Sequence, residues 1–338
     1  MKRTPMRHNR ENTRSVDEFY NQDYVHKPIL WREIVDIIAG SLKKGEGLLV
    51  DSTIGEGGHS EILLKVFPEL KIRGFERDST ILEKAKLRLS SYKERVEFIN
   101  DNFSKMDEYF KDSEKPDYIL YDFGISSYHF DKSKRGFSFA ADEPLDMRLD
   151  NAGVTAAYVV NNYPERELER IIMKYGEENW ARIIAKVIVE RRKSEPVETT
   201  GQLASIVLGA IPKRFHVKNI HPATRVFQAL RIEVNSELEA IEEGLEAGFH
   251  LLNKSGVMMA ISFHSLEDRL VKNYFRRLKK GCLCKSDPGQ CNCRYSSFAD
   301  VLTRKPISPD GNEVLWNNRS RSAKLRAAVK ISDLPEAG

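Results

Sequence analysis

Short apolar runs alternate with amphipathic segments through the first third of the chain. Leu48–Val50 is such a run and ends at Asp51. After a glycine-rich turn, residues 60–67 carry apolar side chains at the three-to-four-residue spacing of a helix. Strands alternating with helices predict βαβ units and a mainly parallel sheet. The other apolar runs are residues 71–75, 96–99 and 118–121.

The pattern changes at a loop rich in glycine, phenylalanine and aspartate, residues 135–150. Helical periodicity then dominates for about ninety residues. It comprises three shorter amphipathic segments and one long one. The long helical pattern runs from Pro222 towards Leu245. Strand character returns at residues 257–263, and a basic helix is expected from Leu266.

These patterns predict an α/β fold with a Rossmann-like, mainly parallel sheet and an inserted all-helical domain. The expected core comprises residues 25–134 and 240–338, and the expected insertion comprises residues 135–239. Residues 1–24 are polar and patternless, which predicts a disordered N-terminal extension. That segment lacks the apolar stretch of a secretory signal, and no apolar run reaches the roughly 18 residues that span a bilayer. We therefore expect a cytoplasmic protein without a membrane partner.

The net charge of +4 is unevenly distributed. Between Arg304 and Lys330 there are seven basic residues and two acidic ones, and a second basic cluster lies at residues 269–280. Concentrated charge suits a phosphate backbone, although a solvated surface has the same composition. The basic residues that we expect to contact phosphates are Arg319, Arg321, Lys324 and Arg326.

The four cysteines fall together as Cys-x-Cys pairs, at residues 282–284 and 291–293. This spacing is tighter than the usual zinc pattern, in which two residues separate each pair of ligands. In a cytosolic chain, such a cluster suggests a metal knuckle or an ordinary thiol-bearing loop before it suggests disulfides. Because the spacing is tight we predict no metal site, and whether the cysteines bind zinc stays open.

The turn after the first predicted strand has the chemistry of an adenosine-cofactor site. Residues 51–60, DSTIGEGGHS, form strand, glycine turn and helix. Glycine permits positive φ and lets the backbone approach a ligand closely. Glu76 follows the next strand about 20 residues beyond the turn, where a carboxylate can accept from ribose hydroxyls.

Two details favour S-adenosylmethionine over a nicotinamide dinucleotide at this turn. The G-x-G-x-x-G spacing of dinucleotide folds is absent, and Asp51 opens the turn. S-adenosylmethionine has no pyrophosphate to place at a helix N-terminus, but it carries a sulfonium and an amino group that carboxylates complement. Phe103, after the third strand, is a candidate to pack on the adenine or, equally, a core aromatic.

Seven sequence blocks resemble the bacterial ribosomal-RNA small-subunit methyltransferase H family, over nearly everything from His26 to Lys330. The glycine turn is one of them. The others are HKPIL at 26–30, RGFSF at 135–139, EPLDMRLD at 143–150, HPATRVFQALRIEVNSEL at 221–238, SFHSLEDRLVK at 262–272 and NRSRSAKLR at 318–326.

The resemblance implies a class I methyltransferase fold and S-adenosylmethionine-dependent methylation of the exocyclic N4 amine of a cytidine near the decoding centre. The implied partner is small-subunit ribosomal RNA or a 30S-type particle, and a homodimer is one open oligomeric state. At His129 most members carry glutamine, and Glu76 replaces a usual aspartate. The implied cofactor contacts are Gly57, Gly58, His59, Glu76, Phe103, Asp122 and His129.

Methyl transfer to a cytidine amine needs a positioned hydrogen-bond acceptor, because the amine lone pair is delocalised into the ring. Asp122 ends the apolar strand 118–121 and is our first candidate for a catalytic residue. Asp146 and His264 are second candidates in loops expected at the same strand ends, and a structural role is open for each. The base must also be splayed out of folded RNA, for which Phe137 and Phe139 are candidate stacking partners, and a buried packing role is equally open for both.

Three other classes share part of this pattern. A nicotinamide oxidoreductase would have the glycine turn and the acidic strand end but not the basic clusters. A non-catalytic RNA-binding protein would not need three carboxylates at strand ends. Asp122-Phe-Gly occurs in kinases, but no glycine-rich kinase loop, strand lysine or His-Arg-Asp loop accompanies it here.

Overall fold

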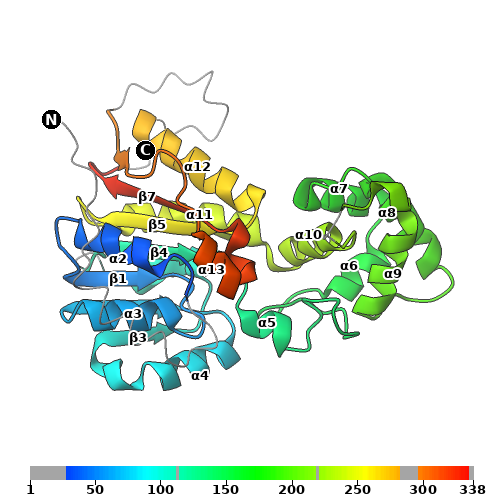
Figure 1. Cartoon of the computed structure of the whole chain (residues 1–338), viewed down its shortest axis with the longest axis horizontal. Helices are drawn as coiled ribbons and strands as arrows, with labels where there is room; N and C mark the ends of the chain where they lie inside the picture. Colours follow the sequence, from blue (N-terminus) through cyan, green and yellow to red (C-terminus); the bar gives the residue numbers. More distant parts are fainter. Residues whose placement is uncertain (1–27, 112–113, 218–220, 282–295, 335–338) are drawn as a thin grey trace. The chain divides into compact units, whose positions relative to one another are not determined.

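The computed structural model describes residues 28–111, 114–217, 221–281 and 296–334. Contacts divide the chain into two compact units, Met1–Gly124 with Ala240–Gly338 and Ile125–Glu239. Figure 1 shows a sheet in the first unit and helices in the second. The sequence patterns place these divisions at residues 134/135 and 239/240.

Within the described residues of the first unit, seven strands form one sheet in the order β3-β2-β1-β4-β5-β7-β6. The neighbours from β3 to β5 pair in parallel, and β7 pairs antiparallel with β5 and β6. This mainly parallel α/β sheet confirms the predicted fold class. The strands are β1 (Gly47–Asp51), β2 (Leu70–Phe75), β3 (Val96–Ile99), β4 (Tyr118–Asp122), β5 (Val257–Ser262), β6 (Ala299–Val301) and β7 (Lys324–Lys330).

Both faces of the sheet are covered, which explains why its strands are near-continuous apolar runs. Leu49, Leu120 and Met259 lie in one buried cluster with side chains of α2 and α3. The opposite face carries Ile119 and Tyr121, against which α11 packs. The helices of this unit are α2 (Trp31–Ala39), α3 (Gly58–Val66), α4 (Ser79–Arg88), α11 (Glu237–Leu251), α12 (Ser265–Lys280) and α13 (Gly311–Trp316), with the 3₁₀ helices η1 (Ser90–Arg95), η2 (Phe103–Tyr109) and η5 (Asn318–Ser322).

Helix α11 approaches the sheet closely because two glycines lie one turn apart on its inner face. A Cβ at Gly244 would overlap the ring of Phe103, and a Cβ at Gly248 would overlap the hydroxyl of Tyr121. The Tyr121 hydroxyl donates to the Gly244 carbonyl at 2.6 Å, so this buried polar group is satisfied. Larger residues at either glycine would push the helix off the strand that ends in Asp122.

The C-terminal basic segment is partly a strand of the sheet, which corrects its assignment as an RNA-contacting tail. Arg326 is buried in β7 and donates to both carboxylate oxygens of Asp268, at 2.7 and 3.2 Å. Lys324 faces the same carboxylate at 3.5 Å. Lys330 is buried and donates to three carbonyls at the end of α11, which lack helical partners. Arg326 and Lys330 therefore stabilise the fold, and Arg319 and Arg321 remain exposed.

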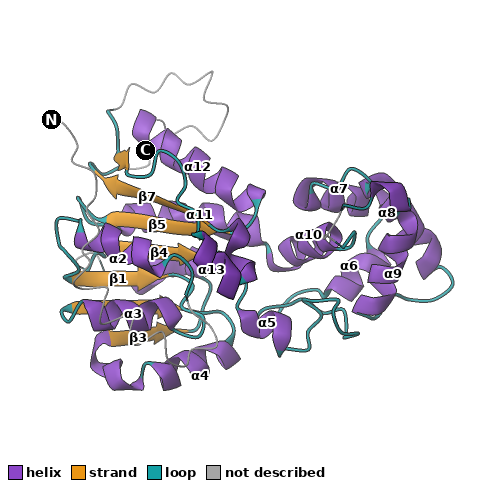
Figure 2. Ribbon diagram, in the orientation of Figure 1, coloured by secondary structure: helices purple, strands orange, loops and turns teal. Residues whose placement is uncertain are grey.

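The second unit is helical in its described residues (Figure 2). The long helical pattern from Pro222 is two helices, because Ser236 adopts φ 49° and ends the first of them. Across both units, no helix of the described residues has the length and apolarity that a membrane crossing needs. The helices are α5 (Ser127–Asp131), α6 (Ala156–Asn162), α7 (Glu165–Gly176), α8 (Ala181–Arg192), α9 (Thr200–Ala210), η3 (Lys213–Phe215) and α10 (Thr224–Asn235).

Two sequence predictions fall outside the described residues. One is the disordered extension at residues 1–24, and the other is the cysteine cluster at residues 282–293. Both stay as predictions from the sequence.

Candidate functional site

The three acidic side chains singled out in the sequence lie at the carboxyl ends of adjacent strands. Asp51 is the last residue of β1, Glu76 follows β2, and Asp122 is the last residue of β4. Asp51 pairs in register with Gly74 on one side and with Leu120 on the other, so these strands end nearly level. In open α/β sheets, ligands bind at this edge.

The glycine turn between β1 and α3 uses the backbone freedom of glycine. Gly57 adopts φ 82° immediately before α3, and Gly55 adopts φ 52°. The Gly57 amide donates to the Ile54 carbonyl at 2.8 Å, which closes the turn. A Cβ at Gly57 would lie 3.1 Å from Leu89, whereas a Cβ at Gly58 would lie 2.9 Å from the ring of Pro28. Gly57 is therefore required by conformation and Gly58 by packing.

Asp51 is turned into the protein and holds the first turn of α3. It is buried and accepts from the Ser60 hydroxyl at 2.6 Å. Burial raises the pKa of Asp51, while the Ser60 hydroxyl and the neighbouring His59 act to lower it. Asp51 therefore supports the glycine turn, and its role beside the cations of a cofactor stays a prediction.

His59 connects the N-terminal segment to Asp122. Its Nε2 lies 2.8 Å from the Ile29 carbonyl oxygen, which can only accept, so Nε2 carries a proton. Its Nδ1 lies 3.4 Å from Asp122 Oδ2. Burial lowers the pKa of His59, against the opposing effects of the Ile29 carbonyl and Asp51. A neutral His59 thus presents an acceptor nitrogen to Asp122.

Asp122 has the electrostatics of a proton acceptor poised near neutral pH. Burial raises its pKa to about 7, and the nearby Glu267 carboxylate acts in the same direction. Its backbone amide donates to Thr53 Oγ1 at 2.7 Å, which fixes the strand end against the glycine turn. Its Oδ1 is buried without a hydrogen-bond partner among the described residues. Such an oxygen is available to a donor group from a ligand.

Glu76 is the second carboxyl with a strongly raised pKa. Burial raises that pKa to about 7, although the backbone amide of Asp78 donates to Oε1 at 2.9 Å. The Glu76 amide is bonded to the Ile99 carbonyl, so the side chain starts from a fixed strand end. Two raised carboxyl pKa values at one sheet edge are typical of a functional site.

The ring of Phe103 packs against neighbouring side chains on one side and is partly exposed on the other. Its ring lies against Gly244 of α11 and makes edge contacts with Tyr121, at a centroid distance of 5.7 Å. The ring of Phe123 is 6.0 Å away. Phe103 is half-buried rather than enclosed, so its remaining surface is open to a planar ligand.

His264 caps a helix. Its Nδ1 accepts from the Glu267 amide at 3.4 Å, and its Nε2 lies 3.0 Å from Glu267 Oε1. The Glu267 side chain in turn accepts from the Phe263 and His264 amides, which completes a capping box at the start of α12. Both ring nitrogens of His264 therefore face Glu267.

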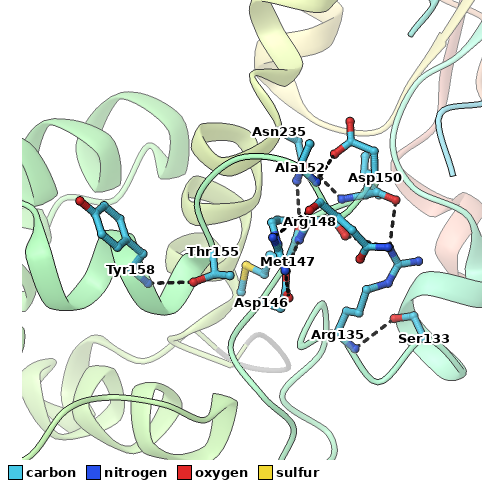
Figure 3. Close-up of polar contacts among 12 residues, drawn as sticks. Ser133, Arg135, Asp146, Met147, Arg148, Asp150, Ala152, Thr155, Tyr158 and Asn235 are labelled. Carbon is cyan, nitrogen blue, oxygen red and sulfur yellow. Dashed lines mark hydrogen bonds and ion pairs between the residues drawn. The ribbon is translucent and has the colours of Figure 1, made fainter. Parts of the chain in front are cut away.

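Asp146 belongs to the second unit, where it is held by Arg148 (Figure 3). Arg148 donates from Nε and Nη2 to the two Asp146 oxygens, each at 2.8 Å. Burial acts to raise the pKa of Asp146, but the Arg148 hydrogen bonds outweigh it and lower that pKa. A carboxylate paired in this way is a poor proton acceptor.

The loop around Asp146 is held by hydrogen bonds between side chains and its main-chain groups (Figure 3). Asn235 of α10 donates to the Met147 carbonyl at 2.8 Å and accepts from the Leu149 amide at 3.0 Å. Arg135 donates to the Arg148 and Leu149 carbonyls. These bonds hold Met147 in its left-handed conformation, at φ 63°.

The aromatic candidates of the second unit pack within it. His129 is buried, with its ring 5.1 Å from that of the buried Phe137. Phe139 is half-buried between His221 and Phe227, at centroid distances of 4.7 and 4.9 Å. Phe137 therefore has a core role, which was one of the two alternatives left open by the sequence.

Sequence analysis missed two hydroxyl residues that organise the edge. Thr53 receives the Asp122 amide, and Ser60 donates to Asp51. Both lie inside the glycine-turn motif, so small hydroxyl residues next to its glycines were the available signal.

Comparison with known proteins assigns a family to this arrangement. Ribosomal RNA small subunit methyltransferase H of Sulfurihydrogenibium azorense is 46% identical over 309 residues, which is 90% of this chain and 99% of that protein. The protein of the same name from Clostridioides difficile is 44% identical over 313 residues, 91% of this chain and 100% of that one. A solved rRNA methylase from Streptococcus thermophilus aligns with a TM-score of 0.43 and 12% identity, over 92% of this chain and all of that one. The model of the MraW methylase family matches residues 23–331, and the chain therefore belongs to that family.

Proposed function

We propose that this protein methylates the exocyclic N4 amine of a cytidine in small-subunit ribosomal RNA, near the decoding centre, in the cytoplasm. It is a methyltransferase whose methyl donor is S-adenosylmethionine. The ribosomal substrate is supported by similarity to proteins named ribosomal RNA small subunit methyltransferase H. They are 44–46% identical to this chain over about nine-tenths of its length. The nucleotide and its amine rest on the resemblance and on the chemistry of Asp122.

The residues at the sheet edge fit S-adenosylmethionine. When bound, this donor supplies a methyl group on a sulfonium. Glu76 would accept from the ribose hydroxyls, and the left-handed turn at Gly57 would admit the donor close to the backbone. The open surface of Phe103 would pack on the adenine, and the buried Oδ1 of Asp122, which has no hydrogen-bond partner among the described residues, would accept from a ligand group.

Asp122 is proposed to accept a hydrogen bond from the target amine. A carboxylate acceptor pushes electron density onto the amine nitrogen and takes up positive charge as the N–H becomes acidic. A pKa of about 7 keeps Asp122 ionised in part at neutral pH while leaving it basic enough to accept a proton. The unprotonated Nδ1 of His59 lies 3.4 Å from Oδ2, so it can accept from this group when Asp122 is protonated but cannot donate to the ionised carboxylate.

The second unit is proposed to bind RNA. Exposed basic side chains on it include Arg191, Lys213 and Arg214. Arg192, which is next to Arg191 in α8, donates to the Val160 carbonyl at 2.6 Å and so has a structural role. We propose that His129 contacts the cofactor, as the resemblance implies. Asp146 and His264 are proposed as secondary catalytic candidates after Asp122.

The proposed function is tested by identifying the methylated nucleoside. The protein is incubated with labelled S-adenosylmethionine and either unmodified small subunits or naked ribosomal RNA, and the RNA is digested to nucleosides. Label in N4-methylcytidine is the expected result, and the better substrate identifies naked RNA or the particle. Label only in another nucleoside would reject the N4 assignment while leaving the methyltransferase activity intact.

Glu76→Gln should weaken S-adenosylmethionine binding by about 10- to 100-fold. Hydrogen bonds to a charged acceptor contribute about 1.5–3 kcal/mol, and glutamine keeps the shape but not the charge. Because the pKa of Glu76 is about 7, wild-type affinity should rise as the pH rises through 7, whereas the variant should show no such rise. Calorimetry between pH 6 and 8 measures both, with exposed Glu108→Gln as the matched control. Equal affinity and equal pH dependence in wild type and variant would exclude Glu76 from the cofactor site.

A further inference from the structure

Helix α13 and the 3₁₀ helix η5 lie at the same sheet edge as Asp122. β7 is antiparallel to β5, and Lys324 at its start pairs with Ser262 at the end of β5. β5 is parallel to β4, with Ile261 opposite Asp122. The residues that immediately precede β7 therefore emerge at the carboxyl edge, as the position of α13 in Figure 1 shows.

One dipeptide joins α13 to the candidate active site. The Leu30 amide donates to Glu313 Oε1 of α13 at 2.8 Å. The carbonyl of the preceding residue, Ile29, accepts from His59, whose other nitrogen faces Asp122. Two successive residues thus connect the inner side of α13 with the carboxylate proposed to receive the amine proton.

The one carboxylate within residues 311–322 is buried, whereas Asp310, which caps α13, is exposed. Glu313 is buried on Leu30, and Asp310 accepts from the Glu313 amide as the cap of α13. Residues 311–322 contain no other carboxylate. The outward surface of residues 311–322 therefore carries no negative side chain.

The outward side chains are apolar or cationic. Leu315 is 85% exposed and Trp316 is 45% exposed. Arg319 and Arg321 of η5 are exposed as well, within five residues of the tryptophan. Large exposed apolar side chains next to cations are costly on an ordinary solvated surface, and they mark interaction sites.

We propose that Leu315, Trp316, Arg319 and Arg321 form a binding surface for an unpaired RNA nucleotide that flanks the target cytidine. This inference rests on the proposed function. Single-stranded nucleic acids are bound by aromatic rings that stack on bases, combined with cations that follow the phosphates. The two guanidinium groups of Arg319 and Arg321, together with the burial of Glu313, favour a polyanion over a protein partner. The position at the edge that holds Asp122 places the bound nucleotide next to the one that reacts.

Trp316→Ala tests the stacking contact. It should weaken binding of a single-stranded oligoribonucleotide of about ten nucleotides, and raise KM for unmodified small subunits, by about 10-fold or more. The turnover number and the affinity for S-adenosylmethionine should stay near wild type, and Trp316→Phe should restore most of the RNA affinity. Leu42→Ala, which changes an exposed apolar residue before β1 at the opposite sheet edge, is the matched control.

Fluorescence separates stacking from a general effect on the fold. Base stacking should quench the wild-type tryptophan emission when the oligoribonucleotide binds. The Trp316→Phe variant should bind the same oligoribonucleotide with most of that quench lost, since Trp31 is buried and only Trp180, which packs on Phe215 in the second unit, can contribute the remainder.

Arg319→Gln with Arg321→Gln tests the phosphate contacts. The slope of log affinity against log salt should decrease by about 0.7–0.9 per lost contact. Replacing Lys43 and Lys44, exposed lysines before β1, with glutamine should leave the slope unchanged.

Unchanged RNA affinity, KM and quench in Trp316→Ala and Trp316→Phe would overturn the inference while the nucleoside assay still supported N4-methylcytidine. Conversely, quenching by RNA without label in N4-methylcytidine would reject the proposed function and retain the RNA-binding surface. If the Trp316 variants had an unchanged KM for small subunits but lost binding to a protein, the surface would belong to a protein partner and the inference would be overturned.

Discussion

Replacing Asp122 with asparagine should lower the single-turnover rate of methyl transfer by about 10²–10⁴ at saturating S-adenosylmethionine. Asparagine preserves the size and shape of the side chain but removes the negative charge that increases the nucleophilicity of the amine. Affinity for RNA should change little, because the carboxylate acts on the reacting group. The measurement is a rapid-mixing assay with labelled cofactor and unmodified small subunits. Asp107→Asn, at an exposed position in η2, is the matched control.

The pH profile gives an independent signature of the same role. The pKa of Asp122 is raised to about 7, so the wild-type rate should rise with pH up to about 7 and level off above it. The groups that face this carboxyl are His59, Asp51 and Glu267. The Asp122→Asn variant should lose the rise. A near-normal rate for this variant at saturating cofactor would remove Asp122 from catalysis and restore Asp146 and His264 as candidates.

Stability distinguishes a catalytic loss from a damaged fold. The pKa of Asp122 is higher in the folded state than its ordinary value of 3.8, so the folded state binds the proton more tightly than the unfolded state does. Folding stability therefore falls as the pH rises from about 4 to 7, and the loss is complete above 7. Without cofactor, Asp122→Asn should have a Tm at or above that of the wild type at pH 8, and the difference should shrink towards pH 4.

The sheet could be predicted because its chemistry is local. Buried parallel strands need continuous apolar runs. Four of the five parallel strands, β1 to β4, coincide with the apolar runs found early in the chain. The acidic residues at the strand ends could be found for the same reason, since a strand end is adjacent to them in sequence. The glycine turn carried its own signal, because a left-handed backbone at Gly57 favours glycine.

The remaining errors concern long-range partners. Arg326 looked like a surface cation, but Asp268, which is 58 residues away, draws it into the sheet. Lys330 is buried because three carbonyls at the end of α11 need a donor. Neither partner can be seen from charge counts along the chain.

Local capping and backbone geometry account for two other differences. His264 looked like a loop histidine near the strand ends, but it is the N-cap residue of α12, with Glu267 three positions later. Ser236 interrupts a continuous helical pattern by taking a left-handed conformation, which hydrophobic periodicity does not register. The Ser/His-x-x-Glu spacing was present in the sequence as a capping signal.

Gly57→Val should weaken S-adenosylmethionine binding by about 30-fold or more. A β-carbon in the left-handed region costs about 1–2 kcal/mol, and displacing Leu89, whose side chain lies 3.1 Å from the new Cβ, adds about 1–3 kcal/mol. If the turn must regain its present shape before the donor binds, this cost appears as lost affinity. Calorimetry measures it, and hydrogen exchange checks that the helices of the second unit stay protected.

Two companion variants make this result specific to the turn. Gly57→Ala adds the backbone cost with less crowding and should give a smaller loss of affinity in the same direction. Gly209→Ala in α9, where a Cβ meets nothing within 4 Å, should leave cofactor affinity unchanged. Gly58→Val is less informative, because its Cβ would strike Pro28 and disturb the segment that holds His59. Wild-type affinity in Gly57→Val would show that the donor does not depend on this turn, and Glu76 and Asp122 would then have to bind it from another approach.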